Sequence, residues 1–67
     1  MEIVLNGEKE VLDKEYTVAE LLEKYEFNPD IVTVAVNGDI LARDTLGNKF
    51  IKDGDTVDIL LFMGGGN

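Results

Sequence analysis

The chain has 67 residues, with fourteen acidic and six basic side chains, a formal net charge of −8, and neither cysteine nor histidine. These counts exclude disulfides, cysteine- or histidine-ligated metal sites and the basic footprint that a nucleic-acid binder needs. Met1 is followed by Glu2 and not by a basic stretch and an apolar run, so we expect no secretory signal. The longest apolar run, residues 59–63, is too short for a membrane span. We therefore expect one small cytoplasmic domain built on a single apolar core.

The opening MEIVLNGEKEVL predicts a β-hairpin. Ile3 and Leu5 alternate with less apolar neighbours, and Asn6-Gly7 suits the two left-handed positions of a type I′ turn. Val11 continues the second strand of this hairpin.

The segment YTVAELLEKYEF predicts the only long helix. Thr17, followed three residues later by Glu20, is a capping-box pattern, and the apolar residues at 18, 21, 22 and 25 share one helical face. We expect Asn28-Pro29-Asp30 to end the helix, because proline restricts the residue before it and cannot continue the hydrogen-bond ladder.

The second half of the chain predicts further strands. Residues 31–36 are rich in β-branched side chains, and a second Asn-Gly pair at 37–38 turns the chain into residues 39–42. After a loop, we expect a short strand at Phe50-Ile51 and a final strand from Thr56 to Phe62.

This order of elements predicts one α+β domain over residues 1–63, followed by a flexible glycine-rich tail over residues 64–67. The domain would have a mixed sheet of four to five strands. A right-handed crossover would lay the helix across one face of that sheet.

The final strand presents two faces. Val57, Ile59 and Leu61 alternate with Asp58, Leu60 and Phe62, and we expect the first set to meet the helix. Leu60 and Phe62 would then be exposed on the open side of the sheet, where an apolar pair beside the tail indicates a partner-binding patch. Single exposed apolar residues are also ordinary on protein surfaces, so both interpretations stand.

The folded body offers no obvious catalytic set, since the chain lacks serine as well as cysteine and histidine. Asp53, Asp55 and Asp58 lie around a turn but lack the pattern of a calcium loop. The tail, GGGN, remains as the unusual feature. Glycine could be threaded into a narrow channel, and its terminal carboxylate could be activated; a frayed end is the plain alternative.

The chain resembles the ThiS/MoaD sulfur-carrier proteins of the ubiquitin-like β-grasp fold, and is most similar to the ThiS type. The resemblance covers essentially the whole chain. It lies in five landmarks in a fixed order: MEIVLNGE, YTVAELLEKY, VTVAVNGDIL, DGDTVDIL and the terminal glycines.

The resemblance implies a carrier that binds no cofactor and catalyses nothing itself. An E1-like adenylyltransferase of the ThiF/MoeB type would use ATP to adenylate the carboxylate of Gly66, and a sulfur donor would convert it to a thiocarboxylate. Gly64 and Gly65 would thread into partners, with Leu60 and Phe62 on the face presented to them. The sulfur would pass to an acceptor of the thiazole synthase or amino-acid sulfhydrylase type.

Asn67 departs from the family pattern, in which the mature chain ends in Gly-Gly. It could be an engineered addition, a native residue on a protein that no longer carries sulfur, or an extension that a metalloprotease removes before activation. The last case resembles carriers that serve cysteine or homocysteine formation, so it leaves the pathway open.

Two rivals to a sulfur carrier remain. A ubiquitin-like interaction module would bind partners through its sheet without sulfur chemistry. An RNA- or nucleotide-binding β-grasp domain is the second, and the net charge of −8 argues against it.

Overall fold

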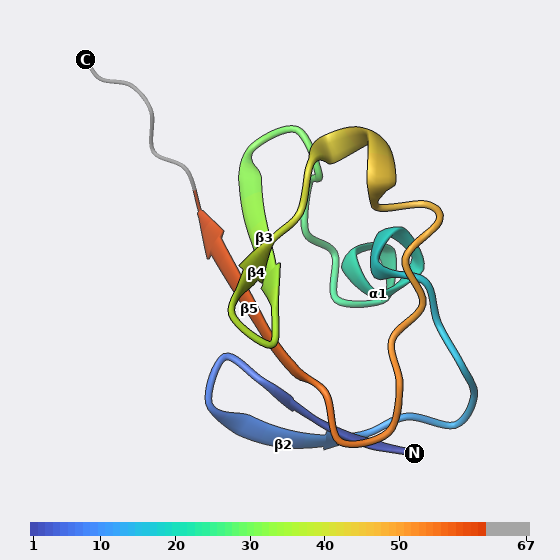
Figure 1. Cartoon of the computed structure of the whole chain (residues 1–67). Coiled ribbons are helices and arrows are strands. Elements are labelled where there is room, and N and C mark those ends of the chain that lie inside the picture. Colours follow the sequence, from blue (N-terminus) through green and yellow to red (C-terminus); the bar gives the residue numbers. More distant parts are fainter. Residues whose placement is uncertain (62–67) are drawn as a thin grey trace.

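The computed structural model describes residues 1–61 and shows one mixed sheet crossed by a helix (Figure 1). The elements in chain order are β1 (Glu2–Leu5), β2 (Glu8–Val11), α1 (Val18–Lys24), β3 (Val32–Val36), β4 (Asp39–Ile40), the 3-10 helix η1 (Arg43–Thr45) and β5 (Thr56–Leu61).

The five strands are ordered β2-β1-β5-β3-β4, which puts the last strand of the chain at the centre of the sheet. β1 and β5 are parallel, and all other neighbours are antiparallel. The expected β-grasp arrangement, a mixed sheet with one main helix, is confirmed. The expected tail, residues 64–67, lies outside the described residues.

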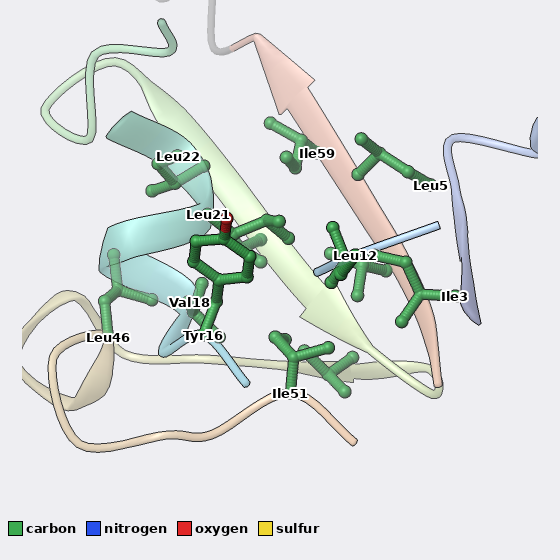
Figure 2. Packing of buried hydrophobic residues seen from close by; sticks show 13 residues of the cluster. Ile3, Leu5, Leu12, Tyr16, Val18, Leu21, Leu22, Leu46, Ile51 and Ile59 are labelled. Carbon is green, nitrogen blue, oxygen red and sulfur yellow. The ribbon is translucent and has the colours of Figure 1, made fainter. Parts of the chain in front are cut away.

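The core fills the space between α1 and one face of the sheet, and Figure 2 shows the helix side chains directed toward the strands. Among residues 1–61, every buried side-chain nitrogen or oxygen has a hydrogen-bond partner. The buried apolar residues are Ile3, Leu5, Leu12, Tyr16, Val18, Leu21, Leu22, Val34, Val36, Leu46, Ile51, Val57 and Ile59.

The start of α1 follows the sequence prediction. Thr17 Oγ1 accepts a hydrogen bond from the Glu20 amide at 3.1 Å, and Glu20 Oε1 accepts one from the Thr17 amide at 3.0 Å. The capping box therefore satisfies two backbone donors at this end of the helix. The Val18 amide donates to the Lys49 carbonyl at 2.8 Å, so the segment before β5 is held against the helix start.

The short strand expected at Phe50-Ile51 does not form. Only an isolated bridge joins Phe50 to Thr17, and the Ile51 amide donates to the Tyr16 carbonyl at 2.8 Å. The backbone groups of this segment pair with the chain that enters α1, so they are not free to build a ladder. Ile51 is nonetheless fully buried, which accounts for its strand-like apolar character.

The helix ends at Lys24, earlier than the proline that was expected to stop it. Glu26 has a left-handed backbone with φ 63°. Its amide donates a hydrogen bond to the Glu23 carbonyl at 3.1 Å, and the Phe27 amide donates one to the Leu22 carbonyl at 2.8 Å. These two bonds form a Schellman motif, in which the left-handed position is usually glycine. A glutamate there gives no sequence signal for a helix end.

Both Asn-Gly turns have the left-handed backbone that was expected. Asn6 and Gly7 have φ values of 49° and 85°, and Asn37 and Gly38 have φ values of 54° and 88°. The asparagine side chains also accept hydrogen bonds from backbone amides of β5. Asn6 Oδ1 accepts a hydrogen bond from the Ile59 amide at 2.7 Å, and Asn37 Oδ1 accepts one from the Thr56 amide at 2.9 Å. The two turns thus hold the central strand at separate points along its length.

Replacing Glu26 with glycine should stabilise the fold by roughly 0.5–1 kcal/mol, because glycine adopts the left-handed conformation without a Cβ clash. For a domain of this size the midpoint of thermal unfolding should rise by about 2–8 °C, measured by circular dichroism. Glu23→Gly is the matched control. Glu23 has helical backbone, so this variant should unfold at a lower temperature. An unchanged or lowered midpoint for Glu26→Gly would contradict the strain at that position.

Replacing Asn6 with glycine should destabilise the fold by about 1 kcal/mol, even though glycine suits the turn, because the Ile59 amide loses its acceptor. Asn6→Asp keeps an acceptor oxygen at the same place and should recover most of the loss. Urea unfolding of the three proteins checks this. Equal stability of Asn6→Gly and the unsubstituted protein would mean that the side-chain bond contributes nothing.

Candidate functional site

β5 leads the chain out of the folded body toward the glycines. β3 pairs with it along its length, from Val36↔Val57 to Val32↔Leu61. β1 pairs only with its beginning, at Val4↔Thr56 and Leu5↔Val57. β5 therefore extends beyond the end of its pairing with β1. Among residues 1–61, only β3 pairs with the last residues of β5.

Leu60 and Leu61 are both exposed at this end of the strand. Leu60 is 61% exposed on the open face, as the sequence predicted. Val57 and Ile59 are buried under the helix, but Leu61, on their face, is 57% exposed. The expectation that this whole face meets the core is wrong at Leu61, because the strand continues past the buried cluster, whose last member on β5 is Ile59.

The open face beside Leu60 carries apolar and small side chains. Thr33 lies directly opposite Leu60, Ala35 is two residues further along β3, and Ile40 lies opposite Ala35 with 73% of its surface exposed. Asp58, partly buried, is the acidic residue of this row on β5. Among the described residues, this face offers apolar contact area around Leu60 together with the carboxylate of Asp58.

The other predicted site residues are Phe62, Gly64, Gly65, Gly66 and Asn67, and they lie outside the described residues. Their assigned roles stay predictions. The structure places the strand that leads to them, and it adds Leu61, which the alternation of the sequence had assigned to the core.

Three ionisable groups with shifted pKa values lie near α1 and the first hairpin. A 2.8 Å hydrogen bond from the Tyr16 hydroxyl lowers the pKa of Asp13 and raises the pKa of Tyr16 itself. Burial is the main cause that raises the pKa of Tyr25, and the hydrogen bond from its hydroxyl to the Glu10 carboxylate raises this pKa further. The Asp13–Tyr16 pair lies in the loop that enters α1, and the Tyr25–Glu10 hydrogen bond joins the end of α1 to β2.

Residues 1–61 contain no group of three metal-ligating side chains and no helix long and apolar enough to cross a membrane. A shallow hollow beside β3 and β4 encloses about 190 Å³, below the roughly 300 Å³ at which ligand pockets begin. Its one ionic side chain, Arg43, donates to the Asp30 carbonyl at 3.1 Å. The hollow is lined by Pro29, Val32, Thr33, Val34, Ile40, Leu41, Arg43 and Leu46.

Two solved structures resemble the whole chain closely. A crystal structure of the thiamine biosynthesis protein ThiS from Geobacter metallireducens is 38% identical, with a TM-score of 0.88, and the match covers 98% of this chain and 100% of that one. A solution structure of a thiamine biosynthesis protein from the same organism is 37% identical, with a TM-score of 0.82, over 100% and 90% of the two chains.

Two curated relatives are thiazole synthases. The chain is 31% identical over 67 residues to that of Paramagnetospirillum magneticum and 33% identical over 66 residues to that of Magnetococcus marinus. It spans about a fifth of the length of these relatives, 21% and 20%, so the match is to one part of a longer protein.

A family model described as the ThiS family matches residues 1–66, which is all of the chain except Asn67. The family match, the close structural likeness and the shared β-grasp sheet agree with the landmarks found in the sequence. The chain belongs to the ThiS family.

Proposed function

We propose that this protein is a sulfur carrier of thiamine biosynthesis, acted on by partner enzymes and not itself an enzyme. The observation that carries this proposal is the ThiS-family match, which extends to Gly66. The likeness to ThiS from Geobacter metallireducens over nearly the full length of both chains supports it. So does the exposed apolar surface at the β5 end.

The chemistry takes place on the carboxylate of Gly66. An oxygen of that carboxylate attacks the α-phosphorus of ATP in an E1-like enzyme of the ThiF/MoeB type, and pyrophosphate leaves. Hydrosulfide, as the sulfur donor, then attacks the acyl carbon, AMP leaves, and loss of the proton on sulfur gives a thiocarboxylate. Gly64 and Gly65 have no Cβ, which lets the backbone pass through a channel too narrow for other residues.

The charge of the carrier fits this role. With a net charge of −8, the body attracts a basic partner surface and approaches it faster than a neutral protein would. Such steering weakens with salt, so encounter would depend on ionic strength.

The acceptor we propose is a thiazole synthase. The two curated relatives with that name are about five times as long as this chain, and one part of each resembles it. Joining donor and acceptor in one chain raises their effective concentration, which is useful only where the two work together. An amino-acid sulfhydrylase of cysteine or homocysteine formation is the alternative acceptor, and Asn67 is what favours it.

Asn67 must leave before the Gly66 carboxylate exists. We infer that a protease, of the metalloprotease class, removes it. The family model ends at Gly66, which supports treating Asn67 as an addition to the working carrier. If Asn67 is retained, the second candidate is a ubiquitin-like interaction module that binds through the open face around Leu60.

Intact mass of untagged protein from its own cells tests the proposal. We expect a species that lacks asparagine, and a further fraction heavier by the difference between sulfur and oxygen. Adding purified thiazole synthase or sulfhydrylase to the loaded carrier should return the lighter mass only with the true acceptor. A single species that keeps Asn67, unchanged by lysate, ATP and sulfide, would favour the interaction module.

Replacing Gly65 with valine should lower the rate of adenylation by about 100-fold or more, because a β-branched side chain misplaces the carboxylate in a narrow channel. Gly47→Val is a matched control, since Gly47 lies in a loop with open space around its Cα and no left-handed backbone. Both variants should unfold at nearly the temperature of the unsubstituted protein. Full adenylation of Gly65→Val, measured by pyrophosphate release, would contradict the threading of the tail.

A further inference from the structure

The last two described residues of β5, Leu60 and Leu61, which we call the β5 end, expose apolar side chains on both faces of the sheet. Leu60 is 61% exposed on the open face, and Leu61 is 57% exposed on the face that carries the core. Val32, opposite Leu61, is only partly buried, and Ile31 before it is 46% exposed. Apolar contact surface therefore continues around the strand from one face to the other.

One backbone edge of the β5 end is also open. β1 stops pairing with β5 at Val57, and the Ile59 amide on that side is taken by the side chain of Asn6. Backbone amides two residues apart on a strand point the same way, so the Leu61 amide is directed to this edge too. Within residues 1–61 no strand lies there to accept it.

The distance to Gly66 requires a partner to come close to this strand. Gly66 is five residues beyond Leu61, and five extended residues span at most about 18 Å. Enzyme sites surround most of the surface of a bound small ligand such as a nucleotide. An enzyme that reaches the Gly66 carboxylate with such a site must therefore bring the rim of its entrance against the β5 end.

We propose that the adenylating enzyme closes around the β5 end on both faces of the sheet, with Leu61 as a binding residue on the helix-side face. An extended segment of the enzyme lies along the open edge and accepts the Leu61 amide, as in β-strand addition. This inference rests on the proposed function and specifies its first partner. The enzyme surface is apolar where it meets Leu60 and Leu61, and basic around them, to match the acidic carrier.

Three threonine variants test the proposal, because threonine keeps strand propensity and shortens the apolar contact. The carriers are Leu61→Thr, Leu60→Thr and the control Val11→Thr, which changes a 77% exposed residue on the outer strand β2. Calorimetric titration of each matured carrier, residues 1–66, with the cell's own ThiF-type enzyme gives Kd. Thermal unfolding of each variant verifies its fold.

We expect Leu61→Thr and Leu60→Thr each to weaken binding by about tenfold or more, and Val11→Thr to leave Kd within about twofold. We also expect the Leu61 amide to become protected from hydrogen exchange in the complex. Loss of binding in Leu60→Thr alone would mean that the enzyme contacts one face only and would overturn the proposal.

Two other outcomes would also overturn it. Normal binding of Leu61→Thr to the adenylating enzyme, together with impaired transfer to the thiazole synthase, would assign the surface to the other enzyme. Absence of binding and of adenylation for the unsubstituted, matured carrier would remove the proposed function and this inference with it. That result is distinct, because it appears before any variant is compared.

Discussion

The pairing of β5 with both halves of the molecule is the constraint on which the rest of the structure depends. β5 lies between β1 and β3, and within residues 1–61 no other strand joins the N-terminal hairpin to the β3–β4 hairpin. Two side-chain amides secure it: Asn6 holds the Ile59 amide and Asn37 holds the Thr56 amide. Val57 and Ile59 of the same strand also belong to the core that packs under the helix. One strand therefore fixes the sheet, the core and the place where the chain leaves the folded body.

The parts of the fold that could be predicted are those written in local patterns. Type I′ turns require left-handed backbone at both central residues, which Asn-Gly pairs adopt readily. A threonine and a glutamate three residues later each accept one amide at the start of a helix. Each signal works within a few residues, so it survives whatever the rest of the chain does. The burial of Val57 and Ile59 followed from simple alternation for the same reason.

The parts that could not be predicted either lack the usual residue signal or depend on distant groups. Glu26 gives no sign of a helix end, since its left-handed backbone is imposed by the Schellman bonds to the last turn. Phe50 and Ile51 look like a strand, but their backbone groups serve the entry to α1. Leu61 belongs by alternation to the core face, and only the extent of the core shows that it is exposed. For the site, the glycine tail was visible in composition, while its chemistry came from the family resemblance.

The central place of β5 has a consequence for biosynthesis of the protein. Among the strands of residues 1–61, the one that completes the sheet is also the last to be made. A nascent chain on the ribosome holds two hairpins and a helix without the strand that joins them, and such long-range pairing is slow and late. The fold of residues 1–61 is therefore completed only after β5 has been made. A chain that terminates before β5 cannot join its two hairpins, so quality control can discard it as unfolded.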